Sequence, residues 1–118
     1  MSLSDPNCLF CKIVLGAVPA KITYRDERLM AFSDTSPKAP FHELIIPNQH
    51  IPSLGMADDE DAALLGQLML VGAERARKAG FSESGFRVVM NTGLDGGQTV
   101  PHVHLHVLAG RPFEWPPG

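Results

Sequence analysis

Imidazole and apolar side chains alternate through one short segment of the chain, "QTVPHVHLHVLAG" (98–110). In chain order the alternating residues are His102, Val103, His104, Leu105, His106 and Val107. Because successive side chains of a β-strand point to opposite faces of a sheet, this alternation predicts a strand over residues 101–108. One face of that strand is apolar and buried, and the other face carries the imidazoles together.

Other segments have the short, β-branched or aromatic character of strands. They cover residues 22–24, 29–33, 42–47 and 86–91, and the first two are separated by a turn at Asp26 and Glu27. Pro47 ends the third of them. The chain has no repeating alternation of strand and helix, which argues against a parallel sheet and favours an antiparallel one.

Two segments have helical signals. The shorter is "NCLFCKIVLG" (7–16), for which we expect Asn7 as the N-cap and Gly16 just past the end. The longer covers residues 58–79, with acidic residues in its first turn and basic residues in its last, as the helix dipole favours. Its apolar stripe follows helical spacing: Leu64, Leu65, Leu68, Val71, Gly72 and Ala76. The sequence thus predicts an α+β fold.

Composition restricts the class of protein. A chain of 118 residues, 44% of them hydrophobic, is long enough for one domain, and no repeat or low-complexity tract divides residues 1–118. The formal net charge of −3 gives no basic patch for nucleic acid or an anionic membrane. No apolar run is long enough to span a membrane, and the N-terminus lacks the pattern of a secretory signal, so we expect a cytoplasmic protein.

Imidazoles that share one face of a strand suit either metal binding or catalysis at phosphorus. A neutral ring nitrogen can attack phosphorus, and a neighbouring imidazole can assist the leaving group. The loop before the strand, "DGGQT", offers the backbone N–H groups of Gly96 and Gly97 to an anion, with Gln98 and Thr99 as further donors. Cys8 and Cys11, three residues apart, suggest half of a metal site or a redox pair.

The motif His102-Val-His104-Leu-His106-Val-Leu resembles the signature of the histidine triad (HIT) nucleotide-binding proteins. The segments "VPAKI", "AFSDTSPKAPFHELIIPNQHI", "DGGQTVPHVHLHVLAGR" and the terminal "WPPG" are similar to the purine nucleoside phosphoramidase branch, over nearly the whole chain. This resemblance implies a five-stranded antiparallel sheet with two helices that pairs as a homodimer. It also implies a hydrolase that cleaves the P–N bond of purine nucleoside phosphoramidates through a nucleotidyl-histidine.

The resemblance assigns roles to particular residues. It implies that His104 is the nucleophile, that His106 assists the leaving group and that His42 aids proton transfer. It implies that Asp34 binds the ribose hydroxyls. Thr99 stands where the family more often has serine. The remaining nucleotide-binding residues that it implies are Phe32, Ile13 and Leu44 around the purine, and Asn91, Gly97, Gln98 and Thr99 at the phosphate and leaving group.

Members of this family that carry the cysteine pair resemble proteins that bind zinc. The resemblance implies a structural Zn²⁺ held by Cys8, Cys11, His50 and His102, with no metal needed for the chemistry. It further implies that Trp115 reaches toward the site of the partner subunit.

Alternative functions remain open at this point. Within enzymes, the alternative is a dinucleoside polyphosphate hydrolase or nucleotidyl transferase that uses the same histidines. A different class is a nucleotide-binding regulatory scaffold whose catalysis is incidental. A purely structural zinc module is the least favoured, because it leaves His104, His106 and Asp34 without a role.

Overall fold

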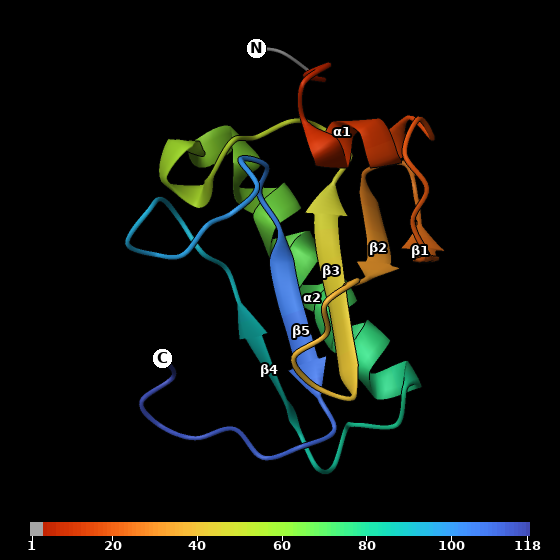
Figure 1. The fold of residues 1–118 in the computed structure, drawn as a ribbon, viewed down its shortest axis with the longest axis vertical. Helices are drawn as coiled ribbons and strands as arrows, with labels where there is room; N and C mark the ends of the chain where they lie inside the picture. Colours follow the sequence, from red (N-terminus) through yellow and green to blue (C-terminus); the bar gives the residue numbers. More distant parts are fainter. Residues whose placement is uncertain (1–3) are drawn as a thin grey trace.

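The computed structural model describes residues 4–118 and forms two layers of helix around one sheet (Figure 1). The sheet has five strands in the order β1-β2-β3-β5-β4, and every neighbouring pair is antiparallel. Its strands are β1 (Ile22–Arg25), β2 (Leu29–Ser33), β3 (Phe41–Pro47), β4 (Phe86–Val89) and β5 (Leu105–Ala109). The helices are α1 (Leu9–Val14) and α2 (Ala62–Lys78), with 3₁₀ turns at Leu54–Met56 and Asp59–Asp61. The predicted α+β fold is confirmed.

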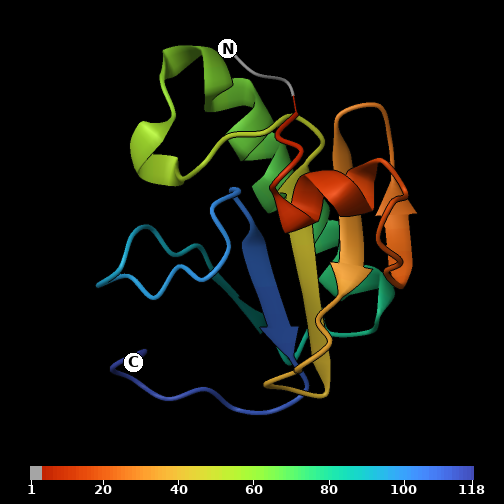
Figure 2. The same ribbon diagram turned by 45° about the horizontal axis from the view of Figure 1, so that its top comes forward.

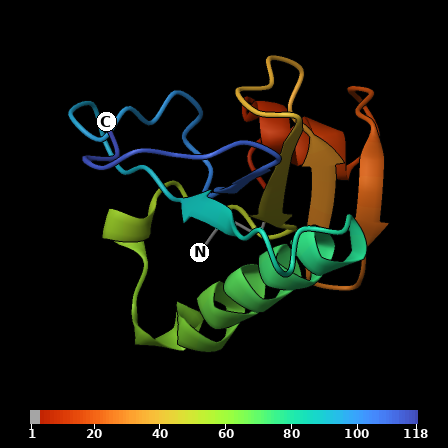
Figure 3. The ribbon, with the colours of Figure 1, turned by 90° about the horizontal axis from the view of Figure 1, so that it is seen from below.

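The two helices cover opposite faces of the sheet (Figure 3). Against α2 lies a core cluster that contains Leu105 and Val107 of β5 and Leu68 of the helix. Against α1 lies a second cluster, in which Phe10 and Ile13 pack with β2 and β3. The alternation over residues 103–107 therefore has the predicted result: Val103, Leu105 and Val107 pack in the cluster with α2, and His104 and His106 lie on the side of α1.

The histidine strand begins later than predicted, at Leu105 instead of Pro101. The N–H of Val103 donates to the carbonyl of Ile51, and the N–H of His102 donates to the carbonyl of Val100. These bonds replace the ladder with β3, so residues 101–104 run beside the sheet without belonging to it. β4 is also shorter than predicted and ends at Val89 rather than Asn91.

The short helix begins one residue later than expected. Its N-cap is Cys8 rather than Asn7, because the Cys8 thiol accepts the N–H of Cys11. Gly16 follows the end of the helix with a φ of +81°, a conformation that glycine adopts without strain, as predicted.

The long helix has its apolar stripe on the sheet, as predicted. Leu64, Leu68, Gly72 and Ala76 are buried, and Leu65 and Val71 are partly buried against them. Its start differs from the prediction, since residues 59–61 form a 3₁₀ turn in which Asp58 and Asp61 cap each other's backbone N–H groups. No helix within residues 4–118 has the length and apolar character needed to cross a membrane.

Candidate functional site

A cavity of about 410 Å³ opens on the α1 side of the sheet, between α1, β2, β3 and the segment that leads into β5. α1 lies beside the beginning of β5 (Figure 2). Residues of α1 and the histidines both line the cavity. Its lining is mainly apolar, with Asp34, Thr99, His104 and His106 among the polar residues. An apolar slot with a few polar groups at one end is typical of a small-molecule site.

The ring of His104 is held in one tautomer. Its Nδ1–H donates to the backbone carbonyl of His102 at 2.7 Å, because a carbonyl can only accept. In the neutral ring the proton is therefore on Nδ1, and Nε2 has the lone pair. The side chain is buried and lines the cavity. A neutral imidazole whose second nitrogen is fixed as a donor is prepared for nucleophilic attack.

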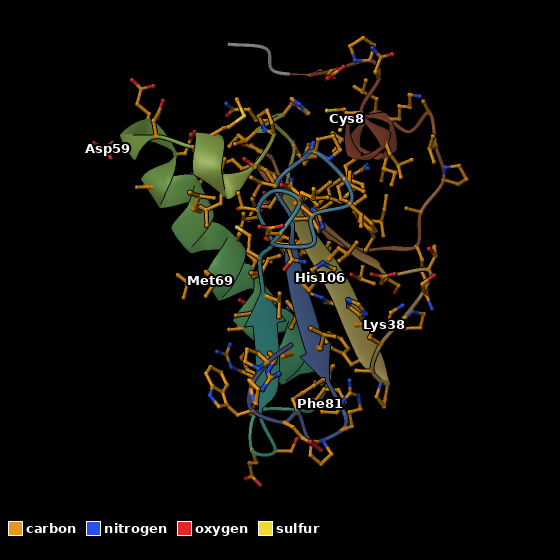
Figure 4. The ribbon with its side chains drawn as sticks, turned by 60° about the vertical axis from the view of Figure 1, so that its left-hand side comes forward. Cys8, Lys38, Asp59, Met69, Phe81 and His106 are labelled. Carbon is orange, nitrogen blue, oxygen red and sulfur yellow. The ribbon has the colours of Figure 1, made fainter. Side chains whose placement is uncertain are left out.

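His106 belongs to a hydrogen-bonded chain of polar groups. The N–H of Lys38 donates to Nδ1 of His42 at 3.0 Å, so the neutral ring of His42 carries its proton on Nε2. That Nε2 lies 2.9 Å from Nδ1 of His106 and 3.4 Å from a carboxylate oxygen of Asp34. His42 therefore donates to His106, which leaves the proton of His106 on Nε2. Figure 4 shows His106 on β5, beside β3 and close to the middle of the sheet.

Burial keeps this chain neutral at ordinary pH. It lowers the pKa of His106 to about 4, and the neighbouring His104 and His42 add to the effect. Burial also lowers the pKa of His42, although the carboxylate of Asp34 opposes this shift. At pH 7 both rings are uncharged and can serve as a donor and an acceptor in the chain.

The structure brings most of the predicted nucleotide residues together, but not all. Those that line the cavity are Ile13, Phe32, Asp34, Leu44, Thr99, His104 and His106. His42 lies behind His106 as described above. Asn91, Gly97 and Gln98 do not line the cavity.

The loop before β5 uses its own polar groups internally. The N–H groups of Gly97 and Gln98 donate to carbonyls of the same loop. The side-chain amide of Gln98 donates to the carbonyls of Pro52 and Val100, and its oxygen accepts the N–H of Gly93. Gly96 is required here, because a Cβ at this position would lie 2.2 Å from the carbonyl oxygen of Thr92. In this structure Gln98 braces the loop, and Thr99 is the residue of the motif that reaches the cavity.

One functional candidate was missed by the sequence analysis. Phe10 of α1 is buried, lines the cavity and packs edge-on against the ring of His104, with ring centroids 5.2 Å apart. The only signal in the sequence is its spacing of three from Ile13, which places both on one face of a short helix. That signal is the same for any core aromatic residue.

A second cluster of polar side chains joins α1 to the start of β5. The Sγ atoms of Cys8 and Cys11 lie 3.3 and 3.6 Å from Nδ1 of His102. Nδ1 of His50 lies 3.4 Å from Sγ of Cys11 and 3.3 Å from Nδ1 of His102. These four residues form a group that could hold a metal ion. Zn–S bonds of about 2.3 Å and Zn–N bonds of about 2.0 Å give a tetrahedron with edges of roughly 3.3 to 3.8 Å, which the spacing matches.

The surroundings of this cysteine–histidine cluster also suit a metal. Nε2–H of His102 donates to the carbonyl of Pro47 at 2.9 Å, which leaves Nδ1 unprotonated and directed at the thiols. Nε2 of His50 lies 3.8 Å from a carboxylate oxygen of Asp5. Burial lowers the pKa of His102 to about 4, which favours the neutral imidazole that a metal needs. The donor types, the neutral state of His102 and the spacing of the four residues fit a four-coordinate zinc.

Asp34, His42 and His106 are also close enough together to be considered as metal ligands. Their hydrogen bonds argue against this role. A histidine that binds metal through Nε2 normally donates from Nδ1. Nδ1 of His42 instead accepts the N–H of Lys38, so Nε2 must keep its proton. We conclude that this group is a hydrogen-bonded chain.

Comparison with known proteins gives the family of this site. The model of the HIT domain matches residues 16–113. An uncharacterized HIT-like protein of Synechocystis is 49% identical over 112 residues, which are 95% of this chain and 97% of that protein. An uncharacterized HIT-like protein of Synechococcus elongatus is 48% identical over the same shares of the two chains.

Solved structures agree with these sequence relatives. The crystal structure of a HIT family hydrolase from Legionella pneumophila has a TM-score of 0.93 at 46% identity, over 95% of this chain and 100% of that one. A histidine triad protein from Clostridium difficile has a TM-score of 0.91 at 40% identity, over 94% of this chain and 96% of that one. The strands and helices of this chain thus have the same arrangement as those of the two solved structures.

Proposed function

The chain belongs to the HIT domain family, and we propose that it is a hydrolase that cleaves purine nucleoside phosphoramidates through a nucleotidyl-histidine. The observation that carries this proposal is the state of His104. Its Nδ1–H is bound to the carbonyl of His102, and its free Nε2 belongs to a ring that lines an apolar cavity. The similar structure from Legionella pneumophila is that of a HIT family hydrolase, which agrees with a catalytic role.

The proposed reaction has two steps at one phosphorus atom. Nε2 of His104 attacks the phosphorus, the P–N bond breaks, and the amine leaves with a proton. His106 is the donor beside the phosphoryl group, because its Nδ1 is occupied by His42 and its Nε2 carries hydrogen. A bound phosphoryl anion favours protonation of this pair of rings, and Asp34 is close enough to balance the charge on His42. Water then attacks the nucleotidyl-histidine, which releases the nucleoside monophosphate.

The cavity fits the remaining parts of a purine nucleotide. We assign the base to the apolar walls formed by Ile13, Phe32 and Leu44, which all line the cavity. Asp34 lines the same cavity and has one carboxylate oxygen bound to the N–H of Ser36. Its other oxygen can accept hydrogen bonds from ribose hydroxyls. Thr99 lines the same cavity as His104 and His106, so its hydroxyl can donate to the phosphate.

We further propose that Cys8, Cys11, His50 and His102 hold a structural zinc ion. With four protein ligands such a site has no open position for water, so zinc would contribute stability and order rather than catalysis. His102 then belongs to the metal site, and only His104 and His106 of the triad face the substrate.

The first experiment measures release of a fluorescent amine from an adenosine 5′-phosphoramidate, with the native chain and with His104→Ala. We expect turnover by the native chain and a loss of about three orders of magnitude or more in the variant, since the nucleophile is gone. Nucleotide affinity, measured by calorimetry, should survive in the variant. The guanosine analogue and a dinucleoside polyphosphate are measured in parallel, and faster turnover of the latter would favour the polyphosphate hydrolase.

A native chain that binds purine nucleotides but turns over none of these substrates would contradict the enzymatic proposal. The nucleotide-binding scaffold would then be the better description. A quenched sample of the native reaction provides a direct check, because the His104 intermediate adds the mass of a nucleotidyl group to the protein.

A further inference from the structure

Phe10 occupies a position between two sites. It lies on α1 between Cys8 and Cys11, the two thiols of the cysteine–histidine cluster, and its side chain is 5% exposed. Its ring packs against the ring of the cluster histidine His102, with centroids 5.8 Å apart and an interplanar angle of 72°. It also packs against His104, at 5.2 Å and 89°. No other side chain of residues 4–118 makes ring contacts with both histidines.

The contact with His104 restrains a degree of freedom that its hydrogen bond leaves open. The bond from Nδ1 to the carbonyl of His102 fixes one atom, but the ring can still swing about that anchor. Phe10 meets the ring edge-on from one direction, and His106 lies at 5.1 Å and 63° from another. Perpendicular aromatic contacts of this kind favour one orientation. Together the three contacts restrict where Nε2 can lie.

The same residue is fixed in turn by the cluster. α1 has six residues, too few to form a stable helix alone, and it begins at the Cys8 cap. A metal bound by Cys8 and Cys11 fixes the turn that carries Phe10. Release of the metal frees this turn, and the ring contact with His104 loosens with it.

We propose that Phe10 is a positioning residue for the nucleophilic imidazole and that it transmits the occupancy of the cysteine–histidine cluster to His104. The inference rests on the proposed function insofar as His104 is the nucleophile. The coupling itself depends only on the contacts of Phe10, so it can be measured without turnover.

The kinetic test compares Phe10→Leu with Phe32→Leu in the zinc-loaded protein. Phe32 is a matched control, because it is buried, lines the same cavity and touches Phe10 at 5.4 Å, whereas the described ring contacts of residues 4–118 include none between Phe32 and a histidine. We expect Phe10→Leu to lower kcat about three- to tenfold, the equivalent of one lost aromatic contact, with a smaller change in KM. Phe32→Leu should mainly raise KM. Phe10→Tyr, which restores the ring, should recover most of kcat.

The second test detects the ring of His104 by ¹⁵N NMR, without substrate. In the zinc-loaded native chain we expect one tautomer with hydrogen on Nδ1. Phe10→Leu should broaden and shift these signals, because the ring then takes more than one orientation around its hydrogen bond, and Phe32→Leu should not. Removal of zinc with a chelator should shift the native signals in the same direction as Phe10→Leu, and it should have little further effect in that variant.

The two tests separate the possible failures. If the His104 signals and kcat of Phe10→Leu equal those of the native chain, the positioning role is wrong. If Phe10→Leu changes the signals but zinc removal does not, transmission from the cluster is wrong. If the native chain has no turnover and the NMR changes still occur, the positioning role survives and only the proposed hydrolase fails.

Discussion

At the scale of single residues, one side-chain type is given different tasks by its hydrogen-bond partners. His104 has a carbonyl on Nδ1, which leaves Nε2 free. His102 has a carbonyl on Nε2, which leaves Nδ1 directed at the cluster thiols. His106 accepts on Nδ1 from His42 and so keeps a donor on Nε2. The tautomer, rather than the residue type, separates nucleophile, metal ligand and proton donor.

The buried, neutral state of His106 predicts a specific dependence of stability on pH. Its pKa is lowered to about 4 in the folded chain, from an ordinary value of 6.5. Between these values the unfolded chain binds more protons, so the stability that His106 contributes is present above pH 6.5 and is lost as the pH falls toward 4. We expect Tm to fall over this window, and to fall less steeply in His106→Asn.

The difference between the two Tm profiles reports the contribution of His106 alone. The other groups that titrate in acid, including the cluster ligands, are the same in both chains. Identical slopes between pH 6.5 and 4 for the native chain and His106→Asn would mean that His106 titrates normally in the folded protein. The hydrogen-bonded chain from His42 would then need revision.

At the scale of elements, α1 depends on contacts that lie far away in the sequence. Its own hydrogen bonds are few, and its position is set by Phe10 and Ile13 on β2 and β3 and by the cluster with His50 and His102. We therefore predict that zinc removal loosens α1 and leaves α2 unaffected. Hydrogen exchange should accelerate in residues 8–15 after treatment with a chelator, and Tm should fall.

Cys11→Ser provides a matched variant for this prediction, because it removes one ligand with little change in size. It should bind less than one equivalent of zinc and show the fast exchange of the chelated protein without any treatment. A purified native chain without stoichiometric zinc, whose Tm does not rise when zinc is added, would refute the metal site.

The close packing of α2 on β5 predicts opposite effects for two glycines of one helix. A Cβ at Gly72 would lie 3.0 Å from Val107 and 3.1 Å from Leu105, whereas a Cβ at Gly66 would meet nothing within 4 Å. Gly66→Ala should therefore stabilise the chain by about 0.5 to 1 kcal/mol through helix propensity. Gly72→Ala should destabilise it by roughly 1 to 2 kcal/mol, because overpacking exceeds that gain. Urea unfolding measures both, and a stabilised Gly72→Ala would contradict the packing.

The strands and helices also differ in how far the sequence predicts them. β2 follows from a short run of apolar residues that comes after a turn, and the buried stripe of α2 follows from helical spacing, so both can be predicted from local sequence. The start of β5 was not predicted, because the N–H of Val103 is bound to Ile51, a partner that no local pattern reveals. The bracing role of Gln98 depends likewise on the carbonyl of Pro52. The reactive residues were identified from the family motif, whereas Phe10 has no motif of its own.

At the scale of the whole molecule, part of the exposed apolar surface lies on the face of the sheet opposite to the site. The cavity is on the α1 side of the sheet, while Met69 and Phe86 expose 47% and 39% of their surface on α2 and on the edge strand β4. Figure 4 shows Met69 on α2, the helix that packs beside β4. β4 has a neighbour only at β5, so its other edge is unpaired within the described sheet. An exposed apolar surface beside an open strand edge favours pairing with a second chain.

We propose that the chain pairs through this surface as the homodimer that the family resemblance implies. A single charge introduced on the surface of α2 and β4 should then prevent pairing. Light scattering should give the native chain twice its mass of 12.8 kDa, and Met69→Glu should shift it to the single mass, because a carboxylate is costly to bury there. Leu15→Glu is the control and should remain dimeric, since Leu15 is 71% exposed at the end of α1, away from β4.

Monomeric Met69→Glu should still bind nucleotide, because the cavity lies on the opposite face. Its turnover should fall if Trp115, 83% exposed in the single chain, completes the site of the partner. A native chain of single mass would refute the dimer, and the exposed Trp115 would then have to act on its own chain.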